Sequence, residues 1–156
     1  MSVASELAAA IATRISEIRT SNGYSTNIGQ TVFRGRATLV EENLPAAVLV
    51  EGDDKVLDAA SHGNMPASLK SSMVKLSQRY IVEGHTVCDP DNPNDAAHLI
   101  LADLKKAIFK GDKTFGGVVK TLTYVGRNIG RREDGASLIA ASVVFDAQFV
   151  EDLANP

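Results

Sequence analysis

The sequence predicts a single α+β domain: a mostly antiparallel sheet with two helices packed on one face and a projecting loop or arm. Two segments carry apolar residues at helical spacing, and the others have the composition or alternation of strands. Turn residues separate them in the order α, β, β, arm, β, α, β, β. A length of 156 residues is typical of one domain, so we expect residues 1–156 to form one unit.

The first helix is expected from Ser5 to Thr20. Its apolar residues recur at steps of four, four and three, which places them on one helical face. They are Leu7, Ile11, Ile15 and Ile18. Ser5 is a suitable N-cap, and Asn22-Gly23 supplies a left-handed stop.

Between this helix and the middle of the chain, short strands alternate with turns. We expect strands at Thr31–Arg34 and, after Pro45, at Ala46–Glu51, with a loop between them. The segment from Gly52 to Ser72 is polar and contains glycine and proline, so it is interpreted as the long loop or projecting arm.

The second half contains three more strands and a helix. Val74–Val87 alternates between apolar and polar residues, as a half-buried strand does. Val118–Asn128 and Ser137–Val150 are the last two strands, and Asp134-Gly135 between them is a strong hairpin signal.

The second helix is expected to start near Asn92-Pro93 and to end at Gly111. Its apolar stripe consists of Ala97, Ile100, Leu101, Leu104 and Ile108. Asp103, Lys105 and Lys106 are expected outside this stripe.

Composition narrows the possible functions. A net charge of −3 and a pI near 5.6 argue against a general nucleic-acid binder, which is usually basic. Cys88 is the only cysteine, which excludes an intrachain disulfide and fits folding in a reducing cytoplasm. We expect no signal peptide and no membrane span.

Two loops have some of the residues of a ligand site. Gly111–Val118 has the outer glycine spacing of a phosphate-binding loop, but Gly117 and Val118 occupy the positions of the required Lys and Ser/Thr. Asp89–Asp95 is rich in oxygen ligands but fails the calcium-loop pattern at Asn94 and Ile100. Both are better explained as connections, the second as a turn and helix cap.

His85 and Cys88 are the other candidates for chemistry. They supply at most two zinc ligands, and no second pair with matching spacing occurs. As a nucleophile pair they lack an evident third group to orient the base. We therefore expect an ordinary buried or half-buried thiol, no cofactor, and a protein that is not an enzyme.

Two charged segments are the candidate interface. Arg127–Gly135 contains three arginines and two carboxylates, and arginine is favoured at protein–protein contacts. The alternatives are a solvated hairpin tip and, third, a phosphate contact. With the start of the arm, the candidate interface residues are Asp53, Asp54, Lys55, Arg127, Arg131, Arg132, Glu133 and Asp134.

The order of short motifs resembles the tail terminator proteins of long, non-contractile phage tails, including the lambda type. The motifs that carry the resemblance are Asn22-Gly23-Tyr24, Val32-Phe33-Arg34-Gly35, Leu44-Pro45-Ala46, Tyr124-Val125-Gly126-Arg127 and Arg131-Arg132-Glu133-Asp134-Gly135. They span nearly the whole chain. The most telling are the Leu-Pro-Ala entry to a strand and the turn before the final strand.

The resemblance implies a structural virion protein at the head-proximal end of the tail, made in the host cytoplasm. Such proteins form a hexameric ring on the last tail-tube ring, end tube polymerisation and present a surface to head-completion proteins, and DNA passes through. A divalent cation in ring formation is also compatible with the family and maps to no residue here.

Three alternatives remain open from the residues. The chain could be another tail or neck component, such as a tube, minor tail or head–tail joining protein. It could also be a small metal-assisted enzyme using His85, Cys88 and Asp89, or a generic binding module of a host.

Overall fold

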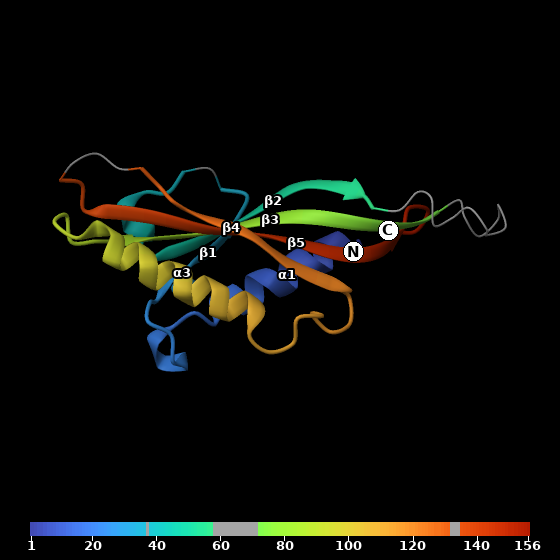
Figure 1. Ribbon diagram of the computed structural model, residues 1–156, viewed down its shortest axis with the longest axis horizontal. Coiled ribbons are helices and arrows are strands. Elements are labelled where there is room, and N and C mark those ends of the chain that lie inside the picture. Colours follow the sequence, from blue (N-terminus) through green and yellow to red (C-terminus); the bar gives the residue numbers. More distant parts are fainter. Residues whose placement is uncertain (37, 58–71, 132–134) are drawn as a thin grey trace.

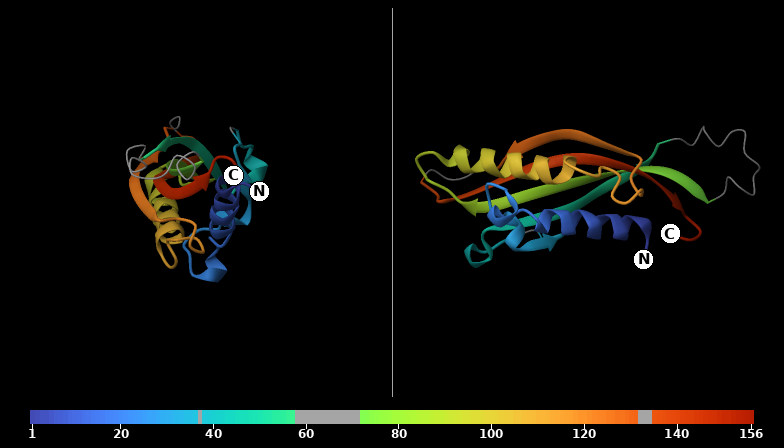
Figure 2. Two further views of the ribbon diagram at one scale, coloured as in Figure 1. Left: turned by 90° about the vertical axis from the view of Figure 1, so that its right-hand side faces the viewer. Right: turned by 90° about the horizontal axis from the view of Figure 1, so that it is seen from below.

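The computed structural model describes residues 1–36, 38–57, 72–131 and 135–156. In these segments, two helices cover one face of a five-stranded sheet, which confirms the predicted α+β class. The helices lie side by side along the long dimension of the sheet (Figures 1 and 2). The first and last residues lie at the same end of the molecule (Figure 1).

The first helix, α1 (Val3–Ser16), packs its apolar stripe into the core. It begins earlier than predicted because Ser2 is the N-cap, and the Ser2 hydroxyl accepts a hydrogen bond from the backbone N–H of Ser5 at 3.2 Å. The helix ends four residues before Thr20, and a short 3₁₀ turn follows. Gly23 closes that turn with a φ of 82°, so the predicted left-handed stop ends the turn rather than the helix.

The second helix, α3 (Pro93–Phe109), begins where the sequence predicts. Asn92 occupies the N-cap position, and Pro93 lies in the first turn, where its missing N–H is tolerated. In the preceding turn, the carboxylate of Asp89 accepts a hydrogen bond from the backbone N–H of Asp91 at 3.0 Å. The interpretation of this segment as a turn and helix start is confirmed. Neither helix in the described segments is both long and apolar enough to cross a membrane.

The five strands are arranged in the order β1-β2-β3-β5-β4. Their bounds are β1 (Val32–Arg34), β2 (Ala46–Val56), β3 (Met73–Val87), β4 (Thr121–Ile129) and β5 (Leu138–Asp152). β1 and β2 are parallel, and the other neighbouring pairs are antiparallel. The register is irregular at one place in β2 and one in β4, between Glu51 and Asp54 and between Tyr124 and Gly126. Each irregularity is a bulge, which bends its strand and increases its twist.

The predicted arm from Gly52 to Ser72 begins as a strand. β2 continues to Val56 and β3 begins at Met73, so the prediction of a loop was wrong for residues 52–56. This outer half of β2 is mostly exposed, and it therefore lacks the apolar alternation by which a half-buried strand is recognised. The rest of the predicted arm, residues 58–71, lies outside the described residues.

The core fills the space between the sheet and the two helices. Side chains from one face of β3 and β5 alternate into it, and the rings of Tyr80 and Phe145 stack with their centroids 5.5 Å apart. α3 lies so close to β3 that Gly84 has no room for a side chain. A Cβ atom there would lie 2.4 Å from Cγ2 of Ile100. Close approach of α3 to the sheet therefore depends on this glycine.

One charged side chain, Asp103 of α3, is buried against expectation, with 3% of its surface exposed. Its carboxylate accepts hydrogen bonds from the backbone N–H groups of Ser25 at 3.0 Å and Thr26 at 2.7 Å. The Thr26 hydroxyl donates a third, also at 2.7 Å. Burial of the carboxylate is therefore compensated, and Asp103 ties the loop after α1 to the middle of α3.

Candidate functional site

The sheet has two free edges, on opposite sides of the molecule (Figure 2). Within the described residues, β4 pairs only with β5, and β1 pairs only with β2. Because β1 is three residues long, Glu51–Val56 of β2 also has no strand on its outer side in the part of the chain that the structure describes. We call β1 with Glu51–Val56 the β1–β2 edge, and Lys120–Arg131 the β4 edge. Edge strands expose backbone donors and acceptors that can pair with another chain, so these edges are the candidate assembly surfaces.

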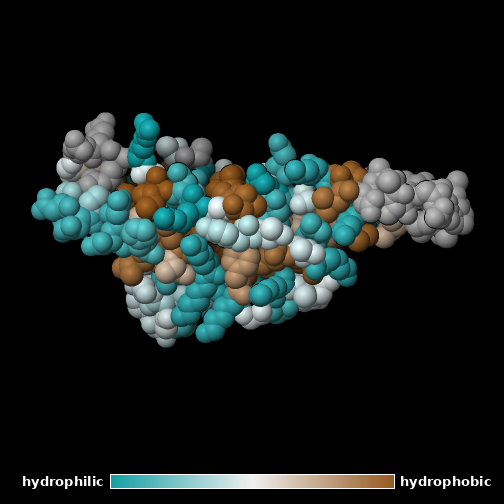
Figure 3. Space-filling view, viewed as in Figure 1, coloured by the Kyte–Doolittle hydropathy of each residue, from teal (hydrophilic) through white to brown (hydrophobic). Residues whose placement is uncertain are grey.

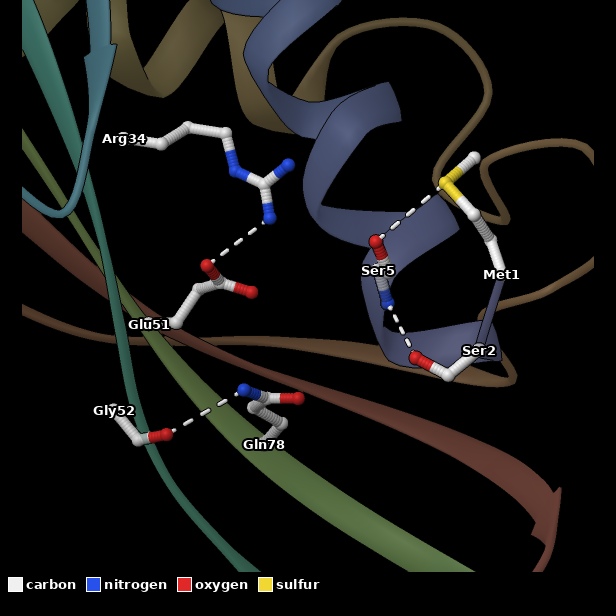
Figure 4. Close-up of polar contacts among 7 residues, drawn as sticks. All are labelled: Met1, Ser2, Ser5, Arg34, Glu51, Gly52 and Gln78. Atoms are coloured by element: carbon white, nitrogen blue, oxygen red, sulfur yellow. Dashed lines mark hydrogen bonds and ion pairs between the residues drawn. The ribbon is translucent and has the colours of Figure 1, made fainter.

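The β1–β2 edge carries the first group of sequence-predicted interface residues. Asp53, Asp54 and Lys55 are all exposed in β2. The side chains of Asp53 and Asp54 form no hydrogen bond or ion pair with any residue in the four described segments. Glu51 differs, because its carboxylate contacts the Arg34 guanidinium of β1 at 3.1 Å (Figure 4). Asp53 and Asp54 are thus the carboxylates of this edge outside that ion pair, and the exposed Lys55 follows them directly.

The β4 edge carries basic and apolar side chains. Lys120, Arg127 and Arg131 are exposed, and neither arginine side chain contacts a partner among the residues that the structure describes. Lys120 makes one long contact of 3.5 Å to a backbone carbonyl. Tyr124 and Val125 are each 44% exposed. Figure 3, which views this side of the molecule, shows apolar patches separated by polar ones.

The structure does not bring the two predicted groups together within one chain. Asp53 lies on β2 and Arg127 on β4, with β3 and β5 between them. Three interstrand spacings of about 4.8 Å separate the two strands by about 14 Å, and Arg127 is level with Leu49 rather than with Asp53, which adds to the separation of the two residues. The other predicted interface residues, Arg132, Glu133 and Asp134, lie outside the described residues.

The chain segments that lead into the two edges differ in their charged residues. The segment from Glu41 to Asp54, which precedes and includes much of β2, contains five acidic residues and no basic one. The segment from Lys113 to Arg131, which leads into and includes β4, contains four basic residues and no acidic one. Acidic residues are therefore more frequent in the first segment and basic residues in the second, although Lys55 directly follows the first segment and Asp112 directly precedes the second.

The face of the sheet opposite the helices has polar contacts that sequence reasoning missed. Arg79 of β3 donates two hydrogen bonds to the carboxylate of Asp146 on β5, at 2.9 and 3.0 Å. With Asp53, Lys55 and Ser77, this pair lines a shallow hollow of about 170 Å³. Only the β3–β5 register places Arg79 beside Asp146, so no pattern along the chain could have shown the pair.

His85 and Cys88 do not form a site together. The His85 ring contacts the Glu83 carboxylate at 3.0 Å and borders a hollow on the face opposite the helices. Cys88 is buried in the core beneath the helices, which confirms the expectation of an ordinary buried thiol. Among the described residues, no group of three or more His, Cys, Asp or Glu side chains is placed to hold a metal ion.

The loop before β4 is held by its own side chains. The Asp112 carboxylate accepts hydrogen bonds from the Thr114 hydroxyl and from the backbone N–H groups of Thr114 and Gly116. These hydrogen bonds lower the pKa of Asp112 to about 2, and the bond from the Thr114 hydroxyl contributes most to the shift. Phe115 lies in the left-handed region with a φ of 48° and is buried, and the Arg14 guanidinium lies 3.8 Å from the centre of its ring. The loop is a connection between α3 and β4, as predicted, but these hydrogen bonds hold it in place, whereas the expectation was a flexible connection.

Comparison with solved structures finds the same fold in a virus-like particle. A chain of the "Virion of native gene transfer agent (GTA) particle" superimposes with a TM-score of 0.54 and 16% sequence identity. The match covers 95% of this chain and 97% of that chain. No protein-family model and no curated protein sequence matched the chain. At this level of identity, the similarity shows a shared fold.

Proposed function

We propose that the chain is a structural protein of a phage or phage-like virion. The observation that carries this proposal is the extent of the fold similarity: almost the whole of this chain matches almost the whole of a virion chain. The free edges of the sheet supply surfaces on which such a protein would assemble. In this role the protein works by binding other subunits, without catalysis.

Within the virion, the role that we propose is that of tail terminator. Copies of the chain form a hexameric ring on the last ring of the tail tube, as the resemblance of its motifs to the family implies. The ring ends tube polymerisation and offers its other face to the head-completion protein, and DNA passes through without sequence-specific binding. The resemblance in the Leu44-Pro45-Ala46 and Arg131-Arg132-Glu133-Asp134-Gly135 motifs of the sequence supports this finer assignment.

Electron microscopy of particles made without this protein tests the role. Loss of a terminator leaves tubes that grow past their normal length and do not join heads. Expression of the wild-type chain in trans is the control, and it must restore joined particles of normal length. Tubes of normal length that fail to join would identify a head–tail joining protein, and complete absence of tubes would identify a tube component. Normal joined particles would contradict a role in assembly.

A further inference from the structure

We propose that the surface where β4 lies beside α3 binds a short acidic segment of another virion protein. We call this surface, formed by Lys105 of α3 with Tyr124 and Arg127 of β4, the α3–β4 surface. The inference rests on the proposed role as a virion subunit, and it names the chemistry of one partner.

The bulge in β4 places Tyr124 and Arg127 on the same face of the sheet. In a regular strand, residues three apart point to opposite faces. Here the register shifts at the bulge, so Tyr124 pairs with Phe145 and Arg127 pairs with Val143. Phe145 and Val143 both point into the core beneath the helices, and paired residues share a face. Tyr124 and Arg127 are therefore neighbours on the helix-covered face of the edge strand.

α3 fixes the Tyr124 ring from the side. The ring of Phe109 meets it edge-on, with the centroids 6.1 Å apart, and the Lys105 ammonium lies 5.3 Å from its centre. Tyr124 is still 44% exposed, and Arg127 is exposed without a side-chain partner in the described part of the chain. Tyrosine and arginine are the residues enriched in the energetic centres of protein–protein contacts. The α3–β4 surface therefore offers a positioned aromatic ring with a cation over it and another beside it.

The charge around this surface is basic. Residues 105–131, which run from the last turns of α3 through the loop to the end of β4, contain seven basic residues and one acidic residue. The other residues of the chain contain nine basic and 18 acidic ones. The one carboxylate, Asp112, is bonded to its own loop, and no ion pair among the described residues includes Lys105 or Arg127. Carboxylates are therefore the groups that complement this surface.

A nucleic acid fits the surface less well than a short acidic peptide segment. Lys105 lies over the Tyr124 ring, where a base would have to stack. A nucleic acid is also an extended polyanion, and beyond this surface it would meet a chain with an excess of acidic residues. A short segment with a few carboxylates and an apolar side chain avoids both difficulties.

A second copy of this chain also fits less well. The carboxylates of the β1–β2 edge are interspersed with Arg34 and Lys55, so that edge is not uniformly acidic. Glu41, at the other end of the sheet, borders a hollow together with Arg131 and His85. The described part of the chain therefore offers no acidic surface to match the α3–β4 surface, and a different protein is the partner that the charges favour.

Titration of purified, isotope-labelled full-length protein with two synthetic peptides tests the surface. The first probe is the terminally blocked peptide Glu-Glu-Leu-Glu-Glu, and the second is Gln-Gln-Leu-Gln-Gln, which has the same size and no charge. In NMR spectra, the acidic peptide at millimolar concentration should shift the backbone amide resonances of Lys105, Tyr124 and Arg127. Higher salt should weaken this effect, and the neutral peptide should not produce it.

Two double variants separate the surface from the overall charge of the protein. Lys105→Gln with Arg127→Gln removes both cations and should lower the affinity for the acidic peptide about fivefold, as the loss of exposed ion pairs does. The matched control is Arg19→Gln with Lys75→Gln, which makes the same charge change at exposed positions on the loop after α1 and on β3. The control should bind the peptide like the wild type. Circular dichroism of each variant confirms that it is folded.

Several results would overturn the proposal. They are an acidic peptide that leaves the three amide resonances unchanged, a neutral peptide that shifts them equally, and a control variant that loses as much affinity as the surface variant. Tighter binding of a short oligothymidine would assign the surface to nucleic acid. A wild-type oligomer that dissociates in the surface variant, as measured by sedimentation velocity, would assign it to a second copy.

The outcomes also separate the surface from the proposed function. If the peptide does not bind while particles lacking the protein are defective, the virion role stands and the α3–β4 surface has no part in it. If the peptide binds as expected while such particles are normal, the acidic partner stands and the virion role fails.

Discussion

Aspartates in two regions of this molecule have opposite surroundings. Asp103, between α3 and the loop after α1, is buried and accepts hydrogen bonds from two backbone N–H groups and a hydroxyl. Asp53 and Asp54, on the outer half of β2, are exposed and have no side-chain partner among the described residues. The first carboxylate holds the chain together, and the other two are available to a second molecule. We therefore expect the helix-covered side to provide stability and substitutions of exposed edge residues to have little effect on folding.

The largest expected effect is that of Asp103→Ala. Its loss leaves two backbone N–H groups and a hydroxyl, which are part-buried, without their charged acceptor, so the free energy of unfolding should fall by about 3 kcal/mol. Urea denaturation followed by circular dichroism measures this change. Asp53→Ala is the matched control and should change the free energy by less than about 0.5 kcal/mol, as exposed substitutions usually do. Equal effects of the two substitutions would abolish the distinction between the two regions.

Substitutions of two glycines, one beneath the helices and one at an edge of the sheet, should give the next largest difference in the free energy of unfolding. At Gly84 a methyl group would lie 2.4 Å from Ile100 Cγ2, and α3 would have to move away from β3. We expect Gly84→Ala to lower the free energy of unfolding by about 2 kcal/mol. Gly126 on β4 has open space around its Cβ position, so Gly126→Ala should be neutral within about 0.5 kcal/mol. Thermal unfolding of both variants measures the difference, and a Gly126 variant as unstable as that of Gly84 would contradict it.

Tyr80 lies in the core, but removal of its hydroxyl should raise the free energy of unfolding, whereas the other core substitutions should lower it. Its hydroxyl is buried and has no hydrogen-bond partner among the described residues, and burial is the main cause of the raised pKa of this phenol. Tyr80→Phe should therefore keep the stacking on Phe145 and raise the free energy of unfolding by about 1 kcal/mol. Phe145→Leu is the comparison variant and should lower it, because the ring contact is lost. A fall in stability on Tyr80→Phe would show that the hydroxyl has a partner.

The smallest effect concerns Asp112, an exposed carboxylate that, unlike Asp53, has partners. Its pKa of about 2 is below the ordinary value of 3.8. The ionised carboxylate therefore stabilises the loop before β4 fully at pH values above 3.8, and this stabilisation is lost as the pH falls through about 2. The carboxyl chemical shift in an acid titration measures this pKa. Thr114→Val removes the hydroxyl that contributes most and should move the pKa of Asp112 up toward its ordinary value. An unchanged titration would exclude that hydrogen bond as the cause.

The elements that could be predicted from the sequence are those with one buried and one exposed face, because their apolar residues recur at a regular spacing. Both helices and the strands β3 and β5 alternate between core and exposed positions, and their existence and order are confirmed. The outer half of β2 was missed because it is exposed and polar, and its strand conformation depends on pairing with β3. The earlier start of α1 was missed because Ser2 and Ser5 are both acceptable N-caps, and only the fold distinguishes them.

The residues of the candidate surfaces could be predicted from the sequence, but their positions relative to one another in the sheet could not. The acidic and basic clusters are visible along the chain, whereas their placement on opposite edges follows from the strand order, which spacing does not encode. Asp103 was expected to be exposed because a carboxylate in a helix usually is, and the loop that covers it comes from 77 residues earlier in the chain. Arg79 and Asp146 are likewise 67 residues apart and meet only through the register of β3 and β5.

The bulges in β2 and β4 have a consequence for the shape of any larger assembly. A regular edge would extend a sheet as a nearly flat ribbon, which has no natural limit and resembles the growth of a fibre. Here each outer strand carries a bend of its own, at Glu51–Asp54 on one side and at Tyr124–Gly126 on the other. Successive molecules joined through such strands would each be turned relative to the last, so such an assembly would curve and not grow straight.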